Sequence, residues 1–153
     1  MKATWYLFHM IGQVAWLGGA MAAMVVALAA KREDPARMGM VARLQGAIYR
    51  TLVGPGALFT VLSGILLTLV MYNQVTAVGF GHWMMAMQGV GILAGVIALV
   101  HTVPTSGKLA RLEPTGATAA AFEGIRQRLV VSAMVSGGLG MFALLTGALY
   151  QNK

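Results

Sequence analysis

No Asp, Glu, Lys or Arg occurs in residues 51–107, which read TLVGPGALFTVLSGILLTLVMYNQVTAVGFGHWMMAMQGVGILAGVIALVHTVPTSG. The same four residue types are also absent from residues 3–30 and 129–152. A helix that crosses about 30 Å of hydrocarbon at about 1.5 Å per residue needs roughly 20 apolar residues. Each shorter stretch can supply one such crossing and the long stretch can supply two. The sequence therefore predicts a membrane protein with four spans.

The polar, glycine-containing run at residues 73–82 divides the long stretch. Continuous apolar runs favour helices over a β-barrel, whose strands are short and alternate in polarity. The predicted fold is all-α: one transmembrane domain, 1–153, folded as an up-down-up-down four-helix bundle. We expect helices near residues 4–30, 50–72, 82–103 and 129–150, with connections at 31–49 and 104–128.

Basic residues gather around the two connections. Nine of the 11 Lys and Arg residues flank them, and the other two are Lys2 and Lys153. Because Lys and Arg concentrate on the cytoplasmic side of a membrane, we expect an N-out/C-out orientation in a bacterial cytoplasmic (inner) membrane. Aromatic residues that suit the outer interface agree with this orientation: they are Trp5, Tyr6, Tyr72, Trp83 and Tyr150.

Composition excludes several function classes. The net charge of +7 does not predict nucleic-acid binding, because the charges flank apolar spans and form no basic face on a folded surface. The expected partner is the lipid bilayer. The chain has no Cys, no carboxylate in the spans and no glycine-rich phosphate loop, so acid–base catalysis would rest on histidine alone. The sequence leaves open whether the protein is an enzyme.

His9 and His82 are the candidate ligands, since an ionisable residue inside a membrane is costly and marks a functional site by default. Both lie at the outer level, whereas His101 is about 28 Å further along the third helix. Gln13 and Gly12 lie at i+4 and i+3 from His9, so the helix face that carries the imidazole is otherwise polar or small. We expect this face to point toward other helices and not toward lipid. The first and third helices are diagonal in the bundle, and imidazoles from opposite sides can hold haem iron. We therefore predict a b-type haem site at His9 and His82, with Gln13 beside it and a redox role.

Copper is the second cofactor hypothesis. Met84 and Met85 closely follow His82, and thioethers together with imidazole suit Cu(I). A copper site would use His9, His82, Met84 and Met85. The chain has 12 Met, however, and most Met residues in such a chain serve packing. A protein without any cofactor, in which His9 only bonds a neighbouring helix, is the remaining alternative.

Small residues suggest a different class of function. The spacings Gly91-xxx-Gly95 and Ser136-xxx-Gly140 allow helix backbones to approach closely. Gln88, Ser132 and Ser136 add expected interhelical hydrogen bonds. These faces serve the bundle, a second copy or a partner membrane protein. The alternative function is therefore a non-enzymatic accessory or assembly subunit of a larger membrane complex.

Local patterns also predict helix shape. Met38, Val41 and Ile48 recur at helical spacing, so the second span is expected to begin as an interfacial helix. Gly54-Pro55-Gly56 should kink that span. A weak internal repeat places Leu62-Ser63-Gly64 and Leu145-Thr146-Gly147 near the outer ends of the second and fourth helices.

A first-helix His9 followed by Trp16-Leu17-Gly18-Gly19, then Arg50, Gly54-Pro55 and Leu62-Ser63-Gly64, resembles small bacterial inner-membrane proteins of the CopD/HemJ-like group. The resemblance covers most of the first two helices. It implies the four-helix architecture, and it implies that His9 is the first-helix histidine that ligates haem in the HemJ group. That group also uses a third-helix lysine. Because no Lys lies between Arg50 and Lys108, we do not extend the resemblance to porphyrinogen oxidation.

Overall fold

The protein folds as four long helices. The computed structural model describes residues 2–30, 34, 37–71 and 82–151. The elements in chain order are α1 (Lys2–Ala30), α2 (Met38–Ile48), η2 (Tyr49–Val53), α3 (Gly54–Val70), α5 (His82–Val96), η3 (Ile97–Thr102), α6 (Val103–Leu109), η4 (Gly116–Thr118) and α7 (Ala119–Gln151). Helices α2, η2 and α3 follow one another without a break, as do α5, η3 and α6. The predicted all-α four-helix bundle is confirmed.

Four of these stretches are long and apolar enough to cross a membrane: Ala3–Ala30, Met38–Val70, Met84–Leu109 and Gly116–Leu149. Large apolar side chains cover the outside of the bundle, with Val14 and Val100 more than 70% exposed. Such a surface suits lipid, where an exposed aliphatic side chain carries no hydration cost. The chain is therefore a multi-pass membrane protein.

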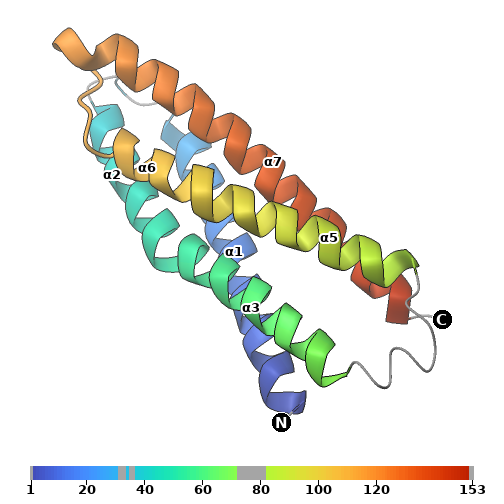
Figure 1. Ribbon diagram of the computed structural model, residues 1–153. Coiled ribbons are helices and arrows are strands. Elements are labelled where there is room, and N and C mark those ends of the chain that lie inside the picture. The colour runs from blue at the N-terminus through green and yellow to red at the C-terminus, as the bar shows by residue number, and fades with distance from the viewer. Residues whose placement is uncertain (1, 31–33, 35–36, 72–81, 152–153) are drawn as a thin grey trace.

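The helices pair as two hairpins. Helix α1 packs along α3, and α5 packs along α7. Figure 1 shows the start of α1 beside the end of α3, and the start of α5 beside the end of α7. These two pairs of helix ends lie apart from each other. At the other end α2 and α6 pack against each other. The bundle is therefore held together most broadly at the end that carries the basic connections.

Trp16 joins the two hairpins at the core. Its side chain is 2% exposed. Methyl groups added at Gly95 of α5 and Gly140 of α7 would lie 3.9 and 3.8 Å from its ring atoms. The indole of α1 thus reaches van der Waals distance of both helices of the second hairpin.

Helices α1 and α3 approach to backbone contact. A methyl group added at Gly56 would lie 2.5 Å from the backbone nitrogen of Trp16 and 2.8 Å from the carbonyl oxygen of Gly12. One added at Gly12 would lie 2.8 Å from the backbone nitrogen of Thr60. Small residues are what permit such close packing between membrane helices. The close contact between the two backbones places side chains of α1 within reach of polar groups on α3.

Three helix boundaries differ from the prediction, and the first span agrees with it. The second helix begins at Met38 instead of near residue 50, the third ends at Leu109 instead of near 103, and the fourth begins at Ala119 instead of near 129. The estimate used only the length that hydrocarbon requires, but a helix continues into water as long as its backbone bonds are satisfied. The interfacial helix expected before the second span is accordingly continuous with it. Of the connecting run predicted at 73–82, only His82 lies within the described residues.

Both proline-containing helices change their winding just before the proline. The π-helical segment η2 ends one residue before Gly54-Pro55, and η3 ends one residue before Val103-Pro104. Proline lacks an N–H and its ring collides with the carbonyl four residues earlier, and a π-helical turn is one way to relieve that conflict. A π-helical segment thus lies just before Pro55, where a kink is predicted, and Pro104 has an equivalent segment that no sequence pattern indicated.

Candidate functional site

His9 lies between α1 and α3 with both ring nitrogens in hydrogen bonds. Its Nδ1 is 2.9 Å from the backbone oxygen of Thr60 and 3.2 Å from Oγ of Ser63. Its Nε2 is 3.2 Å from the side-chain nitrogen of Gln13. Because a carbonyl oxygen can only accept, Nδ1 carries the proton and donates it to Thr60. Nε2 therefore holds a lone pair, which accepts from the amide of Gln13.

This tautomer decides what His9 can do. Histidines that ligate metals commonly donate their other N–H to a backbone carbonyl or carboxylate, which fixes the ring and raises the basicity of the ligating nitrogen. The carbonyl of Thr60 supplies that arrangement here. His9 thus presents one oriented lone pair, and a single neutral amide is the group that caps it.

A glycine on the opposite helix makes the space for the imidazole. A methyl group at Gly64 would lie 3.1 Å from Cε1 and 3.4 Å from Nδ1 of His9. Ser63, immediately before this glycine, is 2% exposed, and its hydroxyl also donates to the carbonyl of Phe59. The Ser63-Gly64 pair, noted in the sequence only as part of a weak repeat, is therefore a wall of the His9 site. Nothing in the spacing alone could show which helix the imidazole faces.

Hydrogen bonds connect Gly64 of the His9 site, through Thr68, to the second hairpin. The hydroxyl of Thr68 donates to the carbonyl of Gly64 at 3.0 Å, and it accepts a hydrogen bond from the side-chain amide of Gln88 on α5. The interhelical bond expected for Gln88 is thereby confirmed. Ser132, for which the same was expected, donates instead to the carbonyl of Leu129 in its own helix, 3.1 Å away.

His82 lies outside the His9 cluster. It is the first residue of α5, on the second hairpin, and its side chain is exposed. The hydrogen-bond partners of His9 all come from α1 and α3. The structure thus brings together His9 and Gln13 of the predicted haem-site residues, and it does not bring His82 into contact with them.

The methionines of the copper hypothesis do not converge. Met84 is buried at 7% exposure, whereas Met85 is 62% exposed. Successive helical residues point about 100° apart, so one thioether faces the bundle and the other faces away from it. Within the described residues, no three His, Asp or Glu side chains come together as a metal site. The copper site remains a prediction without added support.

No family model matches the chain, no curated protein matches it, and no solved structure matches it.

Proposed function

We propose that this multi-pass membrane protein binds b-type haem through His9 and takes part in electron transfer. The observation that carries the proposal is the fixed tautomer of His9, with its Nδ1 proton on the Thr60 carbonyl and its Nε2 lone pair toward Gln13. When bound, haem would supply one-electron redox chemistry that the side chains of this chain lack.

The donor set fits haem iron, for which Nε2 of His9 would be a ligand. An imidazole with its second nitrogen bonded to a carbonyl is the ordinary form of such a ligand. To ligate, Nε2 must exchange the 3.2 Å bond from Gln13 for the metal, and an uncharged amide is a weak competitor. His82 would be the second ligand, because it lies on the other hairpin at the outer end in the predicted topology.

The proposal agrees with the resemblance to the CopD/HemJ-like group, in which a first-helix histidine is the haem ligand. It includes a bacterial cytoplasmic membrane with both termini outside, based on the charge distribution. Because the chain contains no Cys, single-cysteine variants can test the orientation. A membrane-impermeant thiol reagent applied to intact cells should label Thr4→Cys and leave Thr118→Cys unlabelled. The reverse pattern would overturn the orientation.

Haem binding is tested with the purified full chain, expressed with ample haem. The wild-type protein should show a Soret absorption band in stoichiometric amount, and His9→Ala should lose it. His101→Ala is the matched control, since His101 is an exposed histidine of η3 at the other end of the bundle, and it should keep the band. His82→Ala should change the band shape if His82 is the second ligand. A wild-type protein without haem, or full haem in His9→Ala, would refute the proposal.

A second candidate function is that of an accessory subunit that docks on a larger membrane complex. It is favoured by glycines that face open space, since methyl groups added at Gly137 and Gly138 of α7 would meet no atom within 4 Å. The neighbouring Met134 and Met141 are at least half exposed. This function predicts that one partner copurifies in mild detergent, that Gly138→Leu releases it, and that His9→Ala does not. Copurification that survives Gly138→Leu would contradict this docking face.

A further inference from the structure

A pocket opens between the third and fourth helices at the end of the bundle that holds α2 and α6. Its volume is about 220 Å³. That is several times the roughly 30 Å³ of one water molecule and below the roughly 300–1,000 Å³ of pockets for drug-sized ligands. The pocket therefore suits a single small polar group. Its lining residues are Val100, His101, Pro104, Thr105, Lys108, Ile125 and Arg128.

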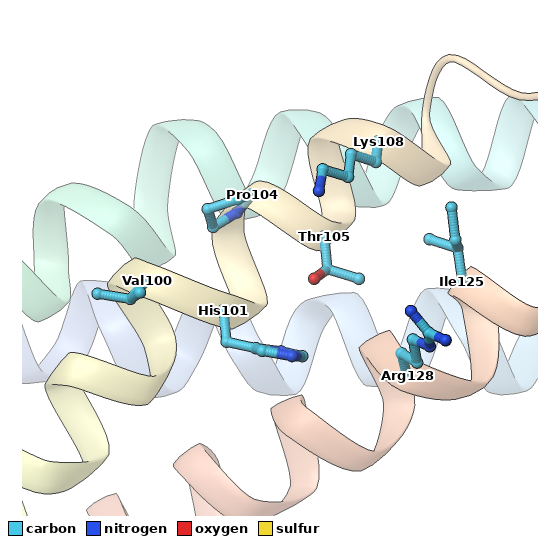
Figure 2. A pocket seen from close by; sticks show the side chains of 7 residues that line it. All are labelled: Val100, His101, Pro104, Thr105, Lys108, Ile125 and Arg128. Carbon is cyan, nitrogen blue, oxygen red and sulfur yellow. The ribbon is translucent and has the colours of Figure 1, made fainter.

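The polar lining consists of donors. Lys108 contributes an ammonium group and Arg128 a guanidinium, while His101 and Thr105 offer an imidazole and a hydroxyl. Figure 2 shows these side chains converging from two helices, with Arg128 of α7 opposite the other three. Among the residues that the structure describes, no carboxylate lines the pocket. An arrangement of two cations without an acid favours an anionic ligand.

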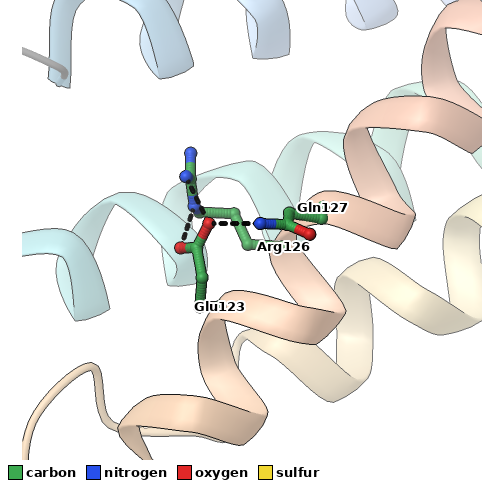
Figure 3. Close-up of polar contacts among 3 residues, drawn as sticks. All are labelled: Glu123, Arg126 and Gln127. Atoms are coloured by element: carbon green, nitrogen blue, oxygen red, sulfur yellow. Dashed lines mark hydrogen bonds and ion pairs between the residues drawn. The ribbon is translucent and has the colours of Figure 1, made fainter.

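The nearby carboxylates are engaged elsewhere. Glu123 receives two hydrogen bonds of 2.7 Å from Arg126 and one of 3.1 Å from Gln127, as Figure 3 shows. Glu113 is paired with Arg43 at 3.3 Å. Across the part of the chain that the structure describes, neither cation of the pocket takes part in an ion pair.

The pocket lies where the apolar part of each helix ends. Lys108 is the first charged residue after the charge-free residues 51–107, and Arg128 is the last one before the charge-free residues 129–152. Both cations therefore lie at the depth of lipid headgroups. Apolar atoms of Val100 and Ile125 line the same pocket and offer a surface for the start of an acyl chain.

We propose that this pocket binds a phosphate group, supplied by the headgroup of an anionic phospholipid. Guanidinium groups bind phosphate oxygens in pairs and ammonium groups bind them as point charges. Basic pockets between membrane helices on the cytoplasmic side bind such headgroups. The site is separate from His9, so its occupancy is independent of haem.

The test is a native mass-spectrometry titration of the purified full chain in detergent. The probes are dioleoylphosphatidylglycerol, dioleoylphosphatidylcholine and inorganic phosphate. The pocket variant is Lys108→Gln with Arg128→Gln. Its control is Arg43→Gln with Arg126→Gln, which removes the same net charge near the same end but outside the pocket lining. A third variant, Lys108→Arg with Arg128→Lys, keeps both charges and reports whether the pocket region still folds.

Wild-type protein should bind one phosphatidylglycerol more tightly than phosphatidylcholine. The pocket variant should weaken phosphatidylglycerol binding by about tenfold or more, while the control and charge-exchange variants should stay close to wild type. Equal affinity for the two lipids, or an equal loss in the control variant, would overturn the proposal. Displacement of phosphatidylglycerol by an equal concentration of inorganic phosphate would assign the pocket to a free phosphate ion and overturn the lipid source.

Discussion

In the first hairpin, Gly64 of α3 makes room for the imidazole of His9 on α1; in the second, Gly147 of α7 makes room for Met87 on α5. A methyl group at Gly64 would lie 3.1 Å from Cε1 of His9, and one at Gly147 would lie 2.8 Å from the sulfur of Met87. The same packing device therefore holds a polar ring in one hairpin and a thioether in the other.

The residues that precede Gly64 and Gly147 differ in their hydrogen bonds. Oγ of Ser63 lies 3.2 Å from Nδ1 of His9 on the facing helix. Thr146 in the second hairpin donates within its own helix, to the carbonyls of Phe142 and Ala143 at 3.2 and 2.9 Å. A thioether needs no hydrogen bond, whereas an imidazole that is half-buried between helices loses water as a partner and gains from hydrogen bonds to its nitrogens. The first hairpin thus carries polar groups that packing does not require, and this is where we locate the chemistry.

The largest expected effect is a loss of stability from a substitution that separates the two helices of the first hairpin. Gly56→Ala would place a methyl group 2.5 Å from the backbone of Trp16, which cannot move without separating α1 from α3. We expect the free energy of unfolding in detergent to fall by about 3 kcal/mol or more. Gly138→Ala in α7 is the control, since it meets no atom within 4 Å, and it should change stability by no more than about 1 kcal/mol. Equal losses would show that the close approach is not specific to α1 and α3.

Substitutions at Gly64 and Gly147 distinguish an effect on the position of His9 from a general effect on helix packing. Gly64→Ala should displace the imidazole of His9, which is held by hydrogen bonds, and lower haem affinity by about tenfold in a haem titration. Gly147→Ala should leave haem affinity unchanged, because the flexible side chain of Met87 can turn away at a cost of about 1 kcal/mol in stability. An equal loss of haem affinity in both variants would contradict the assignment of the site to the first hairpin.

The smallest expected effect concerns the bond between the hairpins. Thr68 accepts from Gln88 across α3 and α5. A double-mutant cycle of Thr68→Val and Gln88→Leu should give a coupling free energy of about 0.6 kcal/mol, the average for such bonds in membrane proteins. Thr146→Val combined with Gln88→Leu should give no coupling, because Thr146 bonds within its own helix. A zero coupling for the first pair would mean that this hydrogen bond does not help to hold the hairpins together.

The four spans could be predicted because charged residues are excluded from hydrocarbon, which leaves an unmistakable gap at residues 51–107. The helix ends could not, because hydrocarbon limits where charges lie and not where a helix stops. Ala119 therefore begins a helix well outside the predicted span. The helix that begins at Met38 was indicated by a different signal, the helical spacing of Met38, Val41 and Ile48.

The candidate site was predicted only in part. The spacing of Gly12 and Gln13 after His9 showed that the imidazole faces a helix, but it could not show that the helix is α3 or that Thr60 and Gly64 meet the ring. The pocket of Lys108 and Arg128 was equally hidden. That both residues line one pocket depends on the alignment of α6 with α7, on which residue spacing within one helix gives no information.

The central claim is that His9 presents a ligand for haem iron. The most direct measurement is the absorption spectrum of His9→Ala, recorded with haem present and then with free imidazole added. We predict no Soret band from protein-bound haem in this variant, and its return with imidazole, because the small molecule can occupy the space that Gly64 leaves for the ring. A full Soret band in His9→Ala before imidazole is added would contradict the claim.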